Sequence, residues 1–140
     1  MNSGPHLATE DGNPRRPTRV LIADDTPGNR ELLRSILESS GYEVAEVEDG
    51  SQVVARAIAF QPDLVILDLQ MPKLDGYAVT TALRKTAGFE STPIVALTAA
   101  LREAAPEEIA RAGFNRYLVK PIGPARMRQC VASLLCPPAA

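Results

Sequence analysis

The stretch at residues 64–68 constrains the fold of this chain more than any other. Residues 64–67 are four consecutive aliphatic side chains, Pro62 and Pro72 lie on either side, and Asp68 ends the apolar run. Such a continuous run is typical of a central strand in a parallel sheet, because helices then cover both of its faces. Ligands bind at the carboxyl ends of strands in such sheets, so we expect Asp68 to face a site. A single aspartate there is more often an ordinary loop residue, so the interpretation depends on what else reaches the same edge.

The size and charge of the chain exclude several classes of protein. A chain of 140 residues has the length of one domain that buries its own core. Its 15 basic and 17 acidic side chains leave a net charge of -2, which does not favour nucleic acid as a partner. No apolar run approaches the roughly 18 residues that span a membrane, and residues 1–17 lack the apolar segment of a signal peptide. We therefore expect a soluble, cytoplasmic protein with no membrane partner.

The two ends of the chain differ from its middle. Residues 1–17 contain three prolines and two glycines and almost no apolar periodicity, so we predict a disordered tail or linker there. The folded domain is predicted over residues 18–136. Cys130 and Cys136 lack both metal-ligand spacing and a nearby histidine, so they are interpreted as reduced thiols, with Cys130 packed on the last helix.

Strand-like and helix-like segments alternate along the predicted domain. We expect strands at residues 19–23, 42–47, 64–68, 93–97 and 114–119. Helices over about residues 76–85, 101–112 and 122–135 follow the last three strands. The first two helices are predicted to bury Leu32, Leu33, Ile36 and Leu37, and Val53, Val54, Ala57 and Ile58. Five strands that alternate with five helices predict an α/β fold, a doubly wound (βα)5 sandwich around a five-stranded parallel sheet.

Polar residues follow several of these strands at one edge of the predicted sheet. Right-handed crossovers bring the carboxyl ends of parallel strands together. The residues gathered there are Asp24, Asp25, Asp68, Thr98 and Lys120. Three carboxylates repel one another unless a cation is present, and Mg²⁺, a hard ion that prefers oxygen ligands and retains waters, meets that need. Together with the lysine and the threonine, this set fits phosphoryl transfer, in which positioning and charge neutralisation dominate catalysis.

One of the three carboxylates must then act as the nucleophile and form an acyl phosphate. Asp68 is the candidate, because it alone ends the central strand while Asp24 and Asp25 share a loop. Asp25 or Thr26 can also cap the helix that opens at Pro27. A cap explains one aspartate but not two adjacent ones, which repel each other.

Four short segments of the chain carry a family resemblance by their order and spacing. They are ADD at 23–25, LDLQMPKLDG at 67–76, LTA at 97–99 and YLVKPI at 117–122. With these segments the chain closely resembles the receiver domain of two-component response regulators, over about residues 18–136. The resemblance implies the flavodoxin-like strand order 2-1-3-4-5. It also implies a signalling domain rather than an enzyme, whose partner is a histidine kinase or a histidine phosphotransfer domain.

The resemblance implies a role for each acidic position. Asp68 would be the phosphoacceptor, which receives the phosphoryl group from a phosphohistidine on the partner. Asp25 would bind Mg²⁺ directly and Asp24 directly or through water. Asp68 would itself be a metal ligand, and the backbone carbonyl of Gln70 would complete the protein ligands.

The resemblance also implies a switch. Lys120 would pair with one phosphoryl oxygen, and Thr98 would move to bind another. Tyr117 would then turn inward and alter the face formed by the fourth helix, the fifth strand and the fifth helix. The family has a cis peptide bond at the position of Lys120 and Pro121. This chain can form one there, because the free-energy cost of a cis peptide bond is small only before proline.

The sequence leaves the subtype open, and three alternative functions fit it less well than a receiver does. Residues 24–33 and 70–72 look like receivers of hybrid histidine kinases or phosphorelays, so the chain is either a stand-alone regulator or an excised receiver, without a DNA-binding output. A haloacid-type phosphatase would need an acidic residue where Gln70 stands, and a flavodoxin-like cofactor site would be repelled by Asp24 and Asp25. The remaining alternative is a pseudo-receiver that works without phosphorylation. The presence of all three aspartates, Asp24, Asp25 and Asp68, argues against it.

Overall fold

A computed structural model describes residues 17–69, 76–99 and 106–135 of the chain. Its strands are β1 (Arg19–Ala23), β2 (Glu43–Val47), β3 (Leu64–Asp68), β4 (Ile94–Thr98) and β5 (Arg116–Val119). Its helices are α1 (Pro27–Ser39), a short 3-10 turn η1 (Gly50–Gln52), α2 (Val53–Phe60), α3 (Gly76–Arg84), α4 (Pro106–Ala112) and α5 (Pro124–Leu135). All strand pairs are parallel and the strand order is β2-β1-β3-β4-β5. The predicted fold class and strand order are therefore confirmed.

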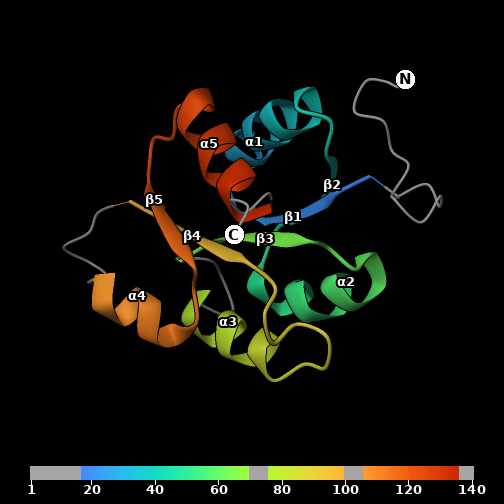
Figure 1. The fold of residues 1–140 in the computed structure, drawn as a ribbon, viewed down its shortest axis with the longest axis vertical. Helices are drawn as coiled ribbons and strands as arrows, with labels where there is room; N and C mark the ends of the chain where they lie inside the picture. The colour runs from blue at the N-terminus through green and yellow to red at the C-terminus, as the bar shows by residue number, and fades with distance from the viewer. Residues whose placement is uncertain (1–16, 70–75, 100–105, 136–140) are drawn as a thin grey trace, which may run out of the picture.

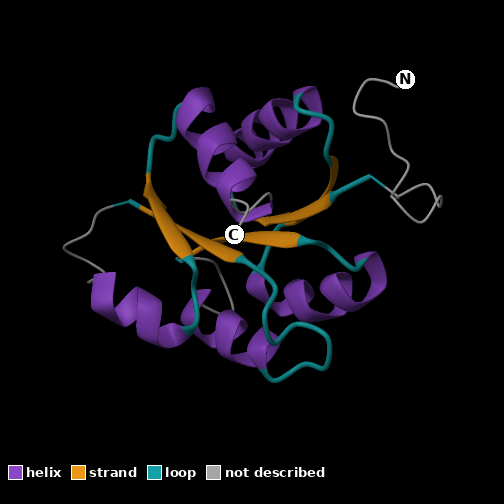
Figure 2. Ribbon diagram, in the orientation of Figure 1, coloured by secondary structure: helices purple, strands orange, loops and turns teal. Residues whose placement is uncertain are grey.

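The sheet is the middle of three layers, with two helices on one face and three on the other. Figures 1 and 2 show α1 and α5 above the sheet, and α2, α3 and α4 below it. Each face has its own apolar cluster, because successive side chains of a strand point to opposite faces. Val20 and Ile22 of β1 join the cluster under α1 and α5, whereas Leu21 and Ala23 join the other. This arrangement leaves the ends of the strands, rather than the faces of the sheet, for function.

The strand β3 lies in the centre of the sheet, as its composition predicts. It pairs with β1 on one side and β4 on the other, and residues 64–67 have no exposed surface at all. Burial on both faces explains why the run is continuously apolar instead of alternating. The register places Leu67 beside Ala23, so β1 and β3 end side by side.

Two of the predicted buried positions are exposed. Leu32 in α1 is 51% exposed and Ile58 in α2 is 52% exposed, so their predicted burial was wrong. The buried stripe of α1 is limited to Leu33, Ile36 and Leu37. At about 100° of rotation per residue, Leu33, Ile36 and Leu37 fall within an arc of roughly 100° around the helix axis, and Leu32 lies outside that arc.

Helix ends agree with the local signals, with small differences in their bounds. Pro27 occupies the first turn of α1, and Gly41, at a φ of +95°, follows its last residues in a conformation that glycine adopts readily. The fifth strand begins at Arg116 and the last helix at Pro124, each two residues later than predicted. The described part of the fourth helix begins at Pro106, and residues 101–105 lie outside the described residues.

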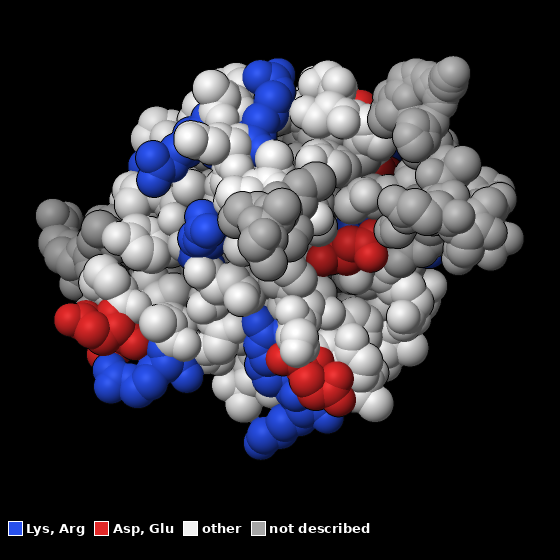
Figure 3. All heavy atoms as spheres, viewed as in Figure 1, with Lys and Arg blue, Asp and Glu red and all other residues white. Residues whose placement is uncertain are grey.

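The remaining predictions about the chain ends are tested only in part. Cys130 is buried on α5 as expected, while Cys136 and residues 1–16 lie outside the described residues. Within the described parts of the chain, no helix has the length and apolar character needed to cross a membrane. Figure 3 shows basic and acidic side chains interspersed on one face of the molecule.

Candidate functional site

Three carboxylates meet where β1 and β3 end. Asp24 and Asp25 follow β1, and Asp68 is the last residue of β3. Each contributes one oxygen atom to a group in which all of these atoms lie within 4.8 Å of one another. Asp24 and Asp68 are buried, whereas Asp25 is exposed, so the group is open to solvent on the side of Asp25. The predicted convergence of these aspartates is confirmed.

A lysine that follows the edge strand β5 offsets part of the negative charge of this group. Lys120 follows β5, and its Nζ atom lies 2.8 Å from Oδ2 of Asp68 and 3.4 Å from Oδ2 of Asp24. The peptide bond between Lys120 and Pro121 is cis. The shorter contact is a charge-assisted hydrogen bond, whereas the longer one is an ion pair without hydrogen-bond geometry. Lys120 therefore binds the candidate acceptor more closely than the candidate metal ligand.

Thr98 ends the strand between the acceptor and the lysine. It is 4% exposed at the end of β4, and its carbonyl oxygen accepts a hydrogen bond from the backbone amide of Lys120 at 2.8 Å. Tyr117 lies two residues upstream of Val119, the residue that pairs with Thr98. Its side chain is half-buried and packs against the apolar cluster between the sheet and the helices α2, α3 and α4. Thr98 and Tyr117 thus lie on adjacent strands. Thr98 is at the end of the sheet where the acidic group lies, whereas Tyr117 is partly exposed at the surface.

Burial and charge shift two pKa values in this group. Burial raises the pKa of Asp24, and the charge of Asp68 adds to the effect, while the Thr26 amide and Lys120 offset part of it. Burial by itself would lower the pKa of Lys120, but its hydrogen bond to Asp68 and the charges of Asp68 and Asp24 outweigh this and raise that pKa. Lys120 is therefore protonated at neutral pH, and burial makes the charged form of Asp24 less favourable than it is in water.

The donor set fits a hard divalent cation. Oδ2 of Asp24 is buried and, among the described residues, accepts no hydrogen bond. Two further carboxylate oxygens lie within 4.8 Å of that side chain's ligand atom. Three oxygen ligands beside an opening to solvent suit Mg²⁺, which binds few carboxylates and retains waters. The fourth predicted ligand, the carbonyl of Gln70, lies outside the described residues, so its role stays a prediction.

Comparisons with known proteins agree with this geometry. The family model of the response regulator receiver domain matches residues 20–132. The polar-differentiation response regulator DivK of Brucella anthropi is 32% identical over 85% of this chain and 97% of its own length. The chain belongs to the response regulator receiver family. It is a phosphoryl-accepting signalling domain with a magnesium-binding acidic site, and histidine kinases are its partners.

Other relatives of this receiver belong to proteins of different architecture. The transcriptional regulatory protein ResD of Bacillus subtilis is 37% identical over 84% of this chain, which spans only 48% of ResD. The receiver domain of the sensor histidine kinase PA1611 from Pseudomonas aeruginosa, solved with a magnesium ion in its active site cleft, is 32% identical at a TM-score of 0.79 and covers 86% of this chain and 98% of its own. Receivers of kinases and of separate regulators both occur among these relatives, so the hybrid-kinase subtype is not specifically favoured.

The start of α1 differs from the sequence prediction. Thr26 is the N-cap residue, but neither its own side chain nor that of Asp25 caps the helix. Instead, the backbone amide of Thr26 donates to Oδ1 of Asp24 at 2.9 Å. The predicted cap was therefore wrong, because this hydrogen bond fixes the buried metal-site carboxylate rather than the helix end.

The start of α3 packs closely against the end of β3, next to Asp68. A Cβ atom on Gly76 would lie 2.9 Å from the Cα atom of Leu69 and 3.0 Å from the carbonyl oxygen of Asp68. Both contacts are with backbone, which cannot move aside as a flexible side chain would. Gly76 therefore allows α3 to start directly against the end of β3, where Asp68 lies.

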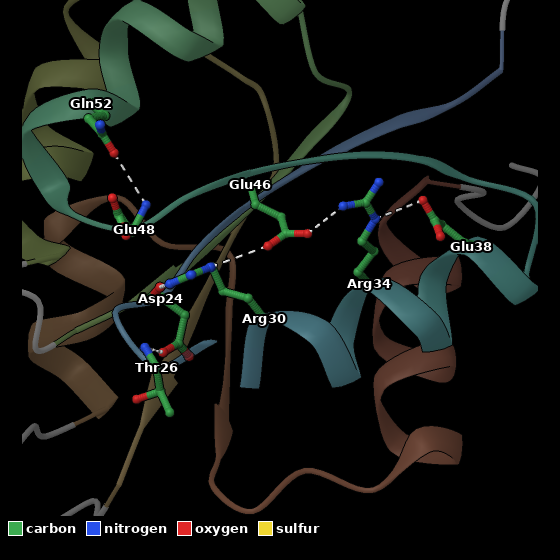
Figure 4. Close-up of polar contacts among 8 residues, drawn as sticks. All are labelled: Asp24, Thr26, Arg30, Arg34, Glu38, Glu46, Glu48 and Gln52. Carbon is green, nitrogen blue, oxygen red and sulfur yellow. Dashed lines mark hydrogen bonds and ion pairs between the residues drawn. The ribbon is translucent and has the colours of Figure 1, made fainter. Parts of the chain in front are cut away.

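Two charged residues near the site were not found from the sequence. Arg30 of α1 donates from Nη1 to the backbone carbonyl of Asp24 at 2.7 Å and pairs with Glu46 of β2 (Figure 4). No short motif marks this contact, because Arg30 is six residues from Asp24 and sixteen from Glu46. An arginine one turn into an amphipathic helix is usually a solvated residue, so only the fold identifies it.

Replacing Asp24 with asparagine should stabilise the metal-free receiver while weakening its response to Mg²⁺. Removal of a poorly compensated buried charge should raise the free energy of unfolding by about 1 kcal/mol. Because the folded state raises the pKa of Asp24, the wild-type penalty is present above that pKa and is relieved as the pH falls through it. The difference between the two proteins should therefore shrink in acid. Urea unfolding with and without Mg²⁺ at several pH values measures both effects.

Asp25→Asn is the matched control for this prediction. Asp25 is exposed, so this variant should lose magnesium-dependent stabilisation without any gain in metal-free stability. A metal-free Asp24→Asn protein less stable than the wild type at neutral pH would show that the charge of Asp24 is well compensated, contrary to the geometry.

Proposed function

We propose that Asp68 is the residue that accepts the phosphoryl group, from a phosphohistidine on a histidine kinase or a histidine phosphotransfer domain. Asp25 binds Mg²⁺ directly in this proposal, and Asp24 binds it directly or through water. The observation that carries the proposal is the convergence of three carboxylates within 4.8 Å with Lys120 at 2.8 Å from Asp68. Asp68 is the natural acceptor, because it is the carboxylate to which the lysine is bound.

The proposed transfer is a displacement at phosphorus. An oxygen of Asp68 forms the new O–P bond while the N–P bond to the donor imidazole breaks, and the electron pair of that bond stays on the imidazole nitrogen. Bound Mg²⁺ would supply positive charge next to the phosphoryl oxygens and reduce their repulsion from the aspartates. Lys120 would move from the carboxylate, which loses its charge on acylation, to one of the phosphoryl oxygens. These contacts stabilise charge where it develops in the transition state.

The proposed switch couples the acceptor to the surface of α4, β5 and α5. The Thr98 hydroxyl donates a hydrogen bond to a second phosphoryl oxygen, and Tyr117 turns inward as Thr98 moves. Two observations support this coupling. The backbone amide of Lys120 donates a hydrogen bond to the carbonyl oxygen of Thr98, and Tyr117 is half-buried on β5, the strand next to Thr98. The pocket between α4 and β5 is lined by Ile109, Phe114 and Tyr117, so rotation of the tyrosine would reshape it. We propose that this takes place in the cytoplasm and changes the affinity for a downstream protein.

Phosphoryl incorporation tests the proposed function directly. Incubation with acetyl phosphate and Mg²⁺ should add one phosphoryl group per chain, and an excess of chelator should prevent it. The product should release phosphate in hydroxylamine, because an acyl phosphate reacts with this nucleophile and phosphoserine does not. Intact-protein mass spectrometry measures the incorporation. Absence of incorporation from both acetyl phosphate and a phosphorylated phosphotransfer domain would favour the phosphorylation-independent alternative.

A further inference from the structure

Arg30 connects the acidic pocket to a line of alternating charges on α1 and β2. Its Nη1 atom donates to the backbone carbonyl oxygen of Asp24 at 2.7 Å, and its Nε atom donates to Oε1 of Glu46 at 3.2 Å. The other oxygen of Glu46 accepts from Arg34 at 2.8 Å, and Arg34 also pairs with Glu38. Figure 4 shows the guanidinium of Arg30 between Asp24 and Glu46. Arg30 is 14% exposed, whereas Arg34 is 48% exposed.

The carbonyl group that Arg30 binds belongs to the peptide unit between Asp24 and Asp25. That unit is planar, so its orientation determines where the chain carries Asp25. Asp24 is also held by its own amide, which donates to Val47, and by the bond from Thr26 to its carboxylate. The Thr26 hydroxyl approaches the Asp25 carboxylate at 3.4 Å, which is too long to fix this side chain firmly. Within the part of the chain that the structure describes, this peptide unit is therefore the main constraint on Asp25.

We propose that Arg30, held in place by Glu46, is a positioning residue that orients the Asp24–Asp25 peptide unit and thereby raises the Mg²⁺ affinity of the acidic pocket. The inference deepens the proposed function, since it concerns the same metal site, but it does not require phosphoryl transfer to occur. Residues that orient metal ligands without touching the ion typically change metal affinity by about 10–100-fold. The short bond, the low exposure of Arg30 and its second anchor on Glu46 are the features expected of such a residue.

The sign of the effect separates positioning from simple electrostatics. Arg30 is a cation close to a site that binds a cation, so loss of its charge alone should strengthen Mg²⁺ binding. Loss of its hydrogen bond to Asp24 should instead weaken binding, because the ligands are then less well ordered. Lysine keeps the charge but lacks the planar fork that reaches two acceptors at once. Arg30→Lys therefore removes the geometry and leaves the charge.

The test is an NMR titration of Arg30→Lys and Arg30→Met with magnesium chloride, compared with Arg34→Lys and Arg34→Met. Arg34 shares Glu46 but does not bind Asp24, so its variants are matched controls. Both Arg30 variants should raise the dissociation constant for Mg²⁺ by about tenfold, and neither Arg34 variant should raise it. The wild-type acetyl phosphate assay is run separately, because its failure would refute the role of Asp68 and leave the affinity comparison unaffected.

Two results would overturn the inference. One is an unchanged or tighter dissociation constant in Arg30→Lys, and the other is an equal weakening in Arg34→Lys. Melting temperatures without metal serve as a second readout, because a merely structural role would lower them while leaving Mg²⁺ affinity unchanged. Arg30→Lys retains the charge and the aliphatic stem, and it decides the question if Arg30→Met does not fold.

Discussion

Replacing Asp68 with asparagine should abolish phosphoryl transfer to this receiver. The amide has neither the charge nor the nucleophilic oxygen needed to form an acyl phosphate, and Asp24 and Asp25 extend from a loop at another strand. We expect incorporation from acetyl phosphate to fall by at least about a hundredfold, given that the nucleophile itself is removed. The variant should still fold, because asparagine has almost the same volume and can accept the hydrogen bond from Lys120. Intact mass spectrometry over a time course measures the loss.

Asp63→Asn is the matched control for Asp68→Asn. Asp63 precedes the same strand at its other end, where its carboxylate accepts a hydrogen bond from the backbone amide of Arg19 at 2.8 Å. An asparagine oxygen can replace that acceptor, so this variant should incorporate phosphoryl at the wild-type rate. A stable, hydroxylamine-sensitive adduct at the wild-type rate in Asp68→Asn would mean that another carboxylate is the acceptor.

Lys120→Ala should lower the stability of the metal-free receiver and uncouple phosphorylation from its output face. The change leaves the buried carboxylates of Asp68 and Asp24 without their cation, a loss that costs up to about 3 kcal/mol for a partly exposed pair. Mg²⁺ should still bind, and it should stabilise this variant more than the wild type, because it supplies the missing positive charge. Once phosphorylated, the variant should show little change in the NMR signals of β5 and α5.

The pH dependence of unfolding provides a second signature of Lys120. Its pKa is raised in the folded state, so its stabilising contribution is fully present below the ordinary lysine pKa of 10.5 and is lost as the pH rises through the folded value. Lys120→Ala should therefore flatten the alkaline decline in stability. The exposed Lys85 at the end of α3 offers a control, and Lys85→Ala should change neither stability nor this slope. A Lys120→Ala protein with wild-type stability and an intact phosphorylation-dependent change in β5 would contradict the role.

The sequence predicts the fold and the acidic group well, because both depend on local patterns. The continuous apolar run of β3 identifies the central strand, and right-handed crossovers then place Asp24, Asp68 and Lys120 at one edge. The family resemblance adds the roles of these residues, which neither the fold nor the geometry tests. The fourth metal ligand, Gln70, lies outside the described residues and remains a prediction.

The features that the sequence does not predict depend on contacts between distant segments. Arg84 donates hydrogen bonds to the backbone carbonyls of Phe89, Thr92 and Gly113 and to the side chain of Asn115, yet its sequence position is that of an ordinary helix-end arginine. Arg30 is a similar case. Leu32 shows the opposite error, since it fits an apolar stripe but lies one step beyond the contact face.

A structure of the receiver with Mg²⁺ and beryllofluoride tests the central claim most directly. Beryllofluoride mimics a phosphoryl group on a carboxylate, so it reports the acceptor and the metal ligands together. We predict beryllium on an oxygen of Asp68, a fluoride bound by Lys120, and the metal ion among Asp24, Asp25 and Asp68. Beryllofluoride on another side chain, or a metal ion away from these three carboxylates, would contradict the account.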